Sequence, residues 1–99
     1  ALFKGTETRI RTDIKSIESA IDFYKAEFRR YPDGWSDLTD AEPEPFLKLI
    51  PLDPWGNEYF YEPPQSGDEY VVGTYGLDGG PGGEGEDADV TNLTIKERN

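Results

Sequence analysis

Apolar residues recur every three or four positions through the first thirty residues of the chain. The steps between them are 4, 3, 4, 3 and 4, and the residues are Ile10, Ile14, Ile17, Ile21, Tyr24 and Phe28. This spacing places all of them on one face of an α-helix, with charged residues on the opposite face. Pro32 disfavours helix at the residue before it, and Asp33 and Gly34 supply a turn. The pattern therefore predicts an amphipathic helix over residues 1–30, whose apolar face must be covered by the rest of the chain or by neighbouring subunits.

Shorter segments, separated by proline and glycine, follow the helix. Residues 31–57 are predicted to be a connecting region anchored by Trp35 and Leu38. The run EPFLKLIP, residues 44–51, offers a short helical turn between two prolines. The sequence DPWGN, residues 53–57, predicts a tight turn, because proline suits its second position and glycine tolerates positive φ.

The C-terminal half reads as β-structure. Residues 58–75 contain two runs in which polar residues alternate with aromatic or β-branched ones, which predicts an antiparallel hairpin. Residues 76–99 comprise an acidic, glycine-rich loop and a C-terminal segment, in which residues 90–95 form a possible last strand. We therefore expect a single α+β domain over residues 1–99. Its long N-terminal helix packs on a small antiparallel sheet, and the C-terminal loop closes it.

Composition and charge limit the partners and metal ions that the chain can bind. The formal net charge of −11 argues strongly against binding to nucleic acid backbones and to anionic membrane surfaces. No apolar run approaches the roughly 20 residues that a transmembrane helix needs. The chain has no cysteine and no histidine, which removes disulfides and the usual zinc, copper and iron ligands. Carboxylate and carbonyl oxygens remain, and these are ligands for calcium and magnesium.

Residues 78–89 concentrate these oxygens, since five of the twelve are glycine and five are acidic. Composition leaves two interpretations open: a solvated, disordered acidic loop, or a loop that a calcium ion organises. Asp78, Gly83 and Asp89 fall at positions 1, 6 and 12 of an EF-hand. The EF-hand interpretation fails, because positions 3 and 5 are glycines and the preceding segment reads as a strand. Magnesium fits less well than calcium, because it prefers to keep several waters.

Two further functions, catalysis and carbohydrate binding, fit the sequence less well than simpler explanations. A catalytic carboxylate pair needs a rigid scaffold and an apolar pocket, and a glycine loop offers neither, so we do not expect an enzyme. The aromatic group Trp55, Tyr59, Phe60 and Tyr61 could form a carbohydrate platform. At strand positions such residues more often form core against a helix, and we favour that interpretation.

Three segments together resemble one known family. They are AIDFYKAEFRRYP at residues 20–32, LDPWGNEYFY at 52–61 and GLDGGPGGEGEDADV at 76–90. The chain resembles the major pseudopilin, the G-type subunit, of the bacterial type II secretion system, within the type IV pilin-like superfamily. The first segment is shared broadly with type IV pilins, whereas the second and third together are quite specific.

The resemblance implies a calcium site in the final loop. Matched by motif, the metal ligands are Asp78, Asp87 and Asp89, with the carbonyl of Tyr75 as a weaker candidate. The other two loop acids, Glu84 and Glu86, are then expected to face solvent. The calcium ion would fasten the loop against the sheet and give the subunit a defined surface for its neighbours.

The resemblance also implies a structural subunit rather than a catalyst. Such a subunit forms a homo-oligomeric filament with other pseudopilins and works with the secretion machinery in protein export across the outer membrane. It is anchored in the bacterial inner membrane by a single N-terminal helix, which with its leader is absent from this sequence, and this domain lies in the periplasm. The chain departs from the family after Asp89, with Thr91 and Leu93 where the family has glycine and tryptophan. The alternatives are a minor pseudopilin or type IV pilin that needs no calcium, and a calcium-dependent carbohydrate-binding module.

Overall fold

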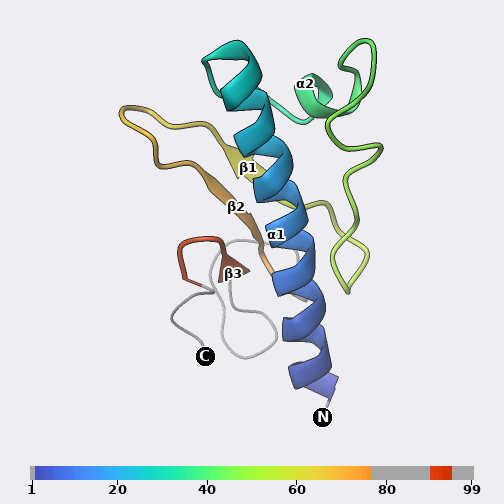
Figure 1. Ribbon diagram of the computed structural model, residues 1–99. Helices are drawn as coiled ribbons and strands as arrows, with labels where there is room; N and C mark the ends of the chain where they lie inside the picture. Colours follow the sequence, from blue (N-terminus) through green and yellow to red (C-terminus); the bar gives the residue numbers. More distant parts are fainter. Residues whose placement is uncertain (1, 77–89, 95–99) are drawn as a thin grey trace.

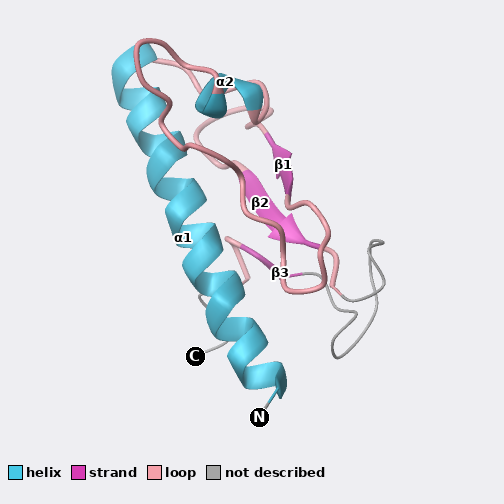
Figure 2. Ribbon diagram, turned by 90° about the vertical axis from the view of Figure 1, so that its right-hand side faces the viewer, coloured by secondary structure: helices cyan, strands magenta, loops and turns pink. Residues whose placement is uncertain are grey.

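The computed structural model describes residues 2–76 and 90–94, with backbone alone for residues 2–5. The elements in chain order are α1 (Leu2–Phe28), α2 (Ser36–Thr39), β1 (Phe60–Glu62), β2 (Val71–Thr74) and β3 (Val90–Thr91). Figure 1 shows α1 running along the whole molecule, with α2 beside its C-terminal end, and Figure 2 shows the sheet on one side of the helix. The prediction of an α+β fold, with a long amphipathic helix on a small antiparallel sheet, is confirmed.

The isoleucine stripe forms the centre of the core. Its five members from Ile10 to Tyr24 are each at most 3% exposed, and they pack in one cluster with Leu38, Tyr59 and Val72. The last member of the predicted stripe, Phe28, is 46% exposed. Its ring lies at the edge of the core, where the centroids of Tyr24 and Phe46 are 4.7 and 6.0 Å away. The stripe is therefore buried from Ile10 to Tyr24. At Phe28 it ends in a cluster of three aromatic rings near α2.

The helix ends two residues before the predicted boundary. Arg29 has φ of 62° and donates its backbone N–H to the carbonyl of Lys25 at 2.8 Å. A residue in the left-handed region directly after the last helical residue is a common way to end a helix, because it redirects the chain while satisfying a terminal carbonyl. Pro32 thus lies beyond the actual end and does not set it.

The sheet has the order β1-β2-β3, and both pairs are antiparallel. Phe60 pairs with Gly73 in the first hairpin, which confirms the predicted pairing of the two runs. Thr74 pairs with Val90, so a last strand lies against β2, but it is shorter than predicted: it spans only Val90–Thr91, and a turn follows at residues 92–94. The buried residues Val72 and Val90 belong to the same cluster as the helix stripe, which is how the sheet covers the apolar face of α1.

The connecting region differs from its prediction in one place. Residues 44–51 form no helical turn, and a helical turn appears earlier instead, as α2. Two prolines in the segment lack the N–H that a helix needs. The free donors of Phe46 and Leu47 both bond to the carbonyl of Leu38, at 2.9 and 3.4 Å. The segment is therefore held on α2, and the predicted anchor Leu38 is fully buried beneath it.

Two tyrosines join the sheet region to the polar flank of α1. The Tyr59 hydroxyl donates to Asp13 Oδ2 at 2.7 Å, and the Tyr70 hydroxyl donates to Asp22 Oδ1 at 3.3 Å. Burial, followed by the neighbouring carboxylate, raises the pKa of both phenols above the ordinary value of 10. Both hydroxyls therefore remain protonated donors at neutral pH, and they fix the position of the sheet on the helix.

Candidate metal centre

The predicted metal ligands divide between described and undescribed residues. Asp78, Asp87 and Asp89 lie outside the residues that the structure describes, as do the two glutamates expected to face solvent. Tyr75 is described and follows β2 directly. Its side chain is half-buried and stacks on Phe60, with ring centroids 4.4 Å apart. The structure therefore fixes the residue at which the chain enters the loop, together with the strands on either side of the loop.

The two ends of the loop meet on the sheet. The chain leaves β2 after Thr74 and returns at Val90, and these two residues are paired partners in an antiparallel ladder. The intervening segment is thus a loop with fixed, adjacent ends rather than a free tail. Holding the ends together lowers the conformational entropy that an ion would have to overcome to order the segment between them.

A buried carboxylate organises the end of β2. Asp53 is 2% exposed, and its Oδ1 accepts the backbone N–H groups of Trp55 at 3.0 Å and Asn57 at 2.8 Å. Its Oδ2 accepts the hydroxyl of Thr74 at 2.5 Å. The Thr74 oxygen in turn accepts the backbone N–H of Gly76 at 3.2 Å. The DPWGN turn is thereby connected to the first residues of the loop.

The turn was predicted from the sequence, but the hydrogen bond between its aspartate, Asp53, and Thr74 was not. Aspartate at the first position of a turn commonly accepts N–H groups two residues later, and that signal was present. The contact with Thr74 spans 21 residues, so no local pattern reveals it.

The return of the chain is held by an asparagine. Asn92 is buried, and its side chain accepts the N–H of Val72 at 2.9 Å and donates to the carbonyl of Tyr70 at 3.1 Å. Its backbone N–H also donates to the carbonyl of Val72 at 2.9 Å. This side chain continues the pairing with β2 beyond the end of β3. Asn92 is thus a structural residue that the sequence analysis did not single out.

The two departures from the family pattern lie in the same short turn. The hydroxyl of Thr91 accepts the N–H groups of Leu93 and Thr94, both at 3.2 Å, and so closes the turn after β3. Leu93 is 41% exposed. The side chain of Thr91 therefore closes this turn. Having threonine here instead of glycine does not prevent β3 from pairing with β2.

The residue types in the chain limit which metals it could bind. Among residues 2–76 and 90–94, no cluster of three or more acidic side chains could hold an ion. The whole chain offers only oxygen donors of the kind that calcium prefers, since it lacks cysteine and histidine. The predicted ligands Asp78, Asp87 and Asp89 lie outside the described residues, so a calcium site in the loop stays a prediction.

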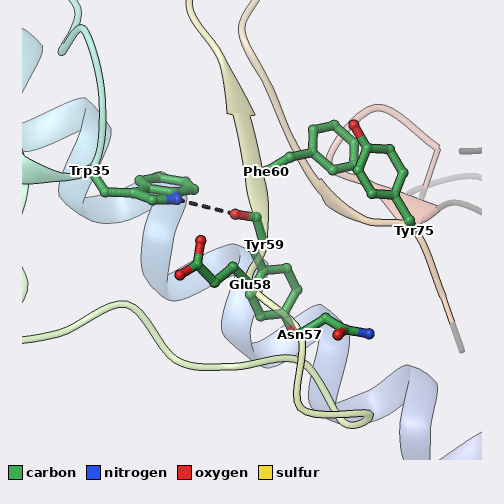
Figure 3. A pocket seen from close by; sticks show the side chains of 6 residues that line it. All are labelled: Trp35, Asn57, Glu58, Tyr59, Phe60 and Tyr75. Carbon is green, nitrogen blue, oxygen red and sulfur yellow. Dashed lines mark hydrogen bonds between the residues drawn. The ribbon is translucent and has the colours of Figure 1, made fainter. Parts of the chain in front are cut away.

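An open cleft of about 530 Å³ lies beside the start of the loop (Figure 3). Its lining residues are Trp35, Asn57, Glu58, Tyr59, Phe60 and Tyr75. The indole N–H of Trp35 donates to the carbonyl of Tyr59 at 3.1 Å, and the rings of Phe60 and Tyr75 stack on each other. Figure 3 shows these rings held by contacts within the protein. Of the four aromatic residues in the predicted group, Tyr59 is buried in the core and Trp55 and Tyr61 pack against it, as the core interpretation expected. Phe60 lies outside that cluster and stacks on Tyr75 instead.

The fold and the loop with paired ends define a class of protein. A long helix, a three-stranded antiparallel sheet and a C-terminal loop returning to the sheet edge are the parts of a pilin-like subunit. Residues 2–93 match the profile of the family described as type II secretion system (T2SS), protein G, and the chain belongs to this family. Neither helix within the described part of the chain has an apolar stretch long enough to span a bilayer.

Relatives and a solved structure agree with this assignment. The chain is 37% identical to the type II secretion system core protein G of Vibrio cholerae, over 95% of this chain and 73% of the relative. It is 35% identical to that of Pseudomonas aeruginosa, over 86% of this chain and 69% of the relative. The crystal structure of the major pseudopilin from the type 2 secretion system of enterohaemorrhagic Escherichia coli has a TM-score of 0.71 and 30% identity. That match covers 92% of this chain and 89% of the solved one.

Proposed function

We propose that this chain is a major pseudopilin, a structural subunit that assembles with copies of itself into the pseudopilus of a type II secretion system. The observation that carries the proposal is the match to the protein G family over residues 2–93. In this role the domain lies in the periplasm, anchored to the inner membrane through a helix preceding α1. It contacts other pseudopilins and the secretion machinery, and it supports export across the outer membrane.

A calcium ion stabilises the subunit in this proposal. Asp78, Asp87, Asp89 and the Tyr75 carbonyl would hold it. The ion would supply positive charge to a segment whose carboxylates otherwise repel one another. The pairing of Thr74 with Val90 supports the proposal, because it holds the ends of the loop together before any ion binds. An ion that binds only the folded chain stabilises it by mass action.

The two alternative functions agree with fewer of the observations. A minor pseudopilin or type IV pilin would share the helix, but the protein G match and the likeness to a major pseudopilin favour the major subunit. A carbohydrate-binding module would need a free aromatic face with a free polar edge. The indole N–H of Trp35 is already bonded within the protein, which weighs against that function. The relatives are secretion-system proteins, which supports a structural role over an enzymatic one.

Calcium is expected to raise the melting temperature of this chain. At a free concentration ten times the dissociation constant, binding to the folded state alone contributes about 1.4 kcal/mol, which corresponds to a rise of roughly 6–11 °C for a domain of this size. Thermal unfolding followed by circular dichroism, with calcium or with chelator, measures the difference. Asp89→Asn is expected to abolish the rise, and Glu84→Gln, which removes the same charge from the same loop, is expected to keep it. Equal melting temperatures in calcium and in chelator would contradict the calcium site.

Filament formation tests the structural role. The full-length protein, with its membrane anchor and secretion machinery, is expected to form filaments visible by electron microscopy. The Asp89→Asn protein is expected to form severalfold fewer, because the surface presented to neighbouring subunits depends on the ordered loop. The Glu84→Gln protein serves as the control and is expected to match the wild type. Abundant secretion without any filament of this subunit would argue against the proposed role.

A further inference from the structure

The apolar stripe of α1 repeats itself from one helical turn to the next. Its first four members are isoleucines, each at most 1% exposed: Ile10, Ile14, Ile17 and Ile21. One turn of a helix takes about 3.6 residues and rises about 5.4 Å, so a shift of that length along the helix axis places most of these side chains where another isoleucine stood. Burial of apolar surface has no preferred direction. The stripe therefore holds α1 against the sheet but distinguishes poorly between positions one turn apart.

Two hydrogen bonds between the helix and the sheet region do not repeat in this way. Asp13 Oδ2 accepts the hydroxyl of Tyr59 at 2.7 Å, and Asp22 Oδ1 accepts the hydroxyl of Tyr70 at 3.3 Å. Both tyrosines are buried, so their hydroxyls have few other partners. Nine residues separate the aspartates, which places the two bonds about 13.5 Å apart along α1. The bonds are directional, and together they fix α1 at two levels of its length.

The polar residues one turn away cannot replace both aspartates. One turn earlier in the helix the corresponding residues are Arg9 and Glu18, and one turn later they are Ser16 and Lys25. An arginine or a lysine has no acceptor to offer a tyrosine hydroxyl. A displacement of α1 by one turn, in either direction, therefore brings a carboxylate to at most one of the two tyrosines.

We propose that the bonds Asp13–Tyr59 and Asp22–Tyr70 set the axial position of α1 on the sheet, and that α1 takes a second position one helical turn away when both bonds are removed. Polar contacts have this role in coiled coils, where a single polar residue fixes the register of the helices. One-turn shifts of one packed element past another also serve as conformational switches. Such a shift would move the sheet by about 5.4 Å relative to α1, together with the loop ends that β2 carries. The inference does not depend on calcium or on filament assembly.

The distance between two spin labels, measured by double electron–electron resonance on this chain, tests the position of α1. The chain has no cysteine, so Thr12→Cys on α1 and Glu62→Cys on β1 define both label sites, and both residues are exposed. Glu62 pairs with the residue that follows Tyr70, and Tyr70 bonds to Asp22. Glu62 therefore lies farther along α1 than Thr12. A shift of α1 by one turn changes the distance between the labels by up to about 5 Å.

The first test removes the two hydroxyls alone. Tyr59→Phe combined with Tyr70→Phe keeps both rings in the core, and we expect a second, displaced distance in at least about one tenth of the molecules, where the wild type gives a single distance. Tyr61→Phe is the matched control, because its hydroxyl donates at 2.7 Å to the carbonyl of Pro32, beyond the end of α1. The control should keep the single distance. An unchanged single distance in the double variant, or an equal shift in the control, would overturn the proposal.

The second test moves both carboxylates by one turn, and it keeps the proposal testable if the double phenylalanine variant does not fold. Arg9→Asp combined with Asp13→Ser and Asp22→Ser leaves carboxylates at positions 9 and 18, which have the same spacing as the native pair. We expect the two tyrosines to bond to these carboxylates. The helix then moves by one turn toward its C-terminal end, and the labels come closer by several ångströms. The wild-type distance in this variant would show that packing of the core alone sets the position of α1.

Discussion

Replacing Ile17 with alanine is expected to lower the free energy of unfolding by about 3–4 kcal/mol, since removing a large aliphatic side chain from a packed core costs its transfer energy and leaves a cavity. Ile17 is fully buried and lies at the centre of the helix stripe, in one cluster with Ile14, Ile21 and Val72. Domains of this size are stable by about 5–15 kcal/mol in total, so the loss is a large share. Urea unfolding followed by tryptophan fluorescence measures it.

Two variants set the scale for this result. Ile17→Val removes a single methylene and is expected to cost about 1 kcal/mol, which keeps the test informative if the alanine variant is largely unfolded. Phe23→Ala removes a larger side chain from the same helix, but Phe23 is 68% exposed, so the change should stay within about 0.5 kcal/mol. If Ile17→Ala cost no more than Phe23→Ala, the helix stripe would not be the core that holds the sheet.

The stripe could be read from the sequence because its information is local. A step of three or four residues places side chains on one helix face whatever the helix packs against, and so the buried face of α1 was predictable from Ile10 to Tyr24. Alternation likewise predicted the hairpin of β1 and β2. The helix end was misplaced, since Arg29 adopts a left-handed conformation that no sequence rule assigns to arginine.

The contacts that define the loop entrance could not be read in this way. Asp53 was recognised only as a turn residue, because its partner Thr74 is distant in sequence and close only in the folded chain. The same holds for Asn92, because its side chain bonds to Val72 and Tyr70, which lie 20 and 22 residues earlier in the sequence. Residues 44–51 failed for a related reason, since their donors bond to Leu38 rather than to one another. Polar side chains that act at a distance carry no periodic signal.

These long-range contacts hold both ends of the loop in place. One end is held by the chain from Asp53 through Thr74 to Gly76, and the other by Asn92 on the backbone of Val72. The middle strand β2 carries both ends. A change on β2 should therefore affect stability and the loop together, whereas a change in the core of α1 should affect stability alone.

Replacing Gly73 with alanine tests whether β2 holds both ends of the loop. The free energy of unfolding is expected to fall by about 2–3 kcal/mol. Gly73 lies in the middle of β2 and pairs with Phe60 on one side and Thr91 on the other. A Cβ at this position would lie 2.5 Å from the carbonyl oxygen of Val90, 2.8 Å from Thr91 Cγ2 and 2.9 Å from Phe60 Cζ. The phenyl ring can move aside, but the backbone carbonyl of β3 can move only with its strand. We therefore expect β3 to separate from β2.

Hydrogen exchange distinguishes separation of β3 from a general loss of stability. The amide of Asn92, which donates to the Val72 carbonyl, should exchange much faster in Gly73→Ala than amides in the middle of α1 do. Gly34→Ala is the control, because its Cβ would meet nothing within 4 Å, and it should leave stability unchanged or raise it by up to about 1 kcal/mol. With β3 detached, Thr74 and Val90 no longer hold the loop ends together, so the rise in melting temperature that we propose for calcium should be lost as well. A Gly73→Ala chain that keeps both its Asn92 protection and its calcium response would show that β3 does not close the loop.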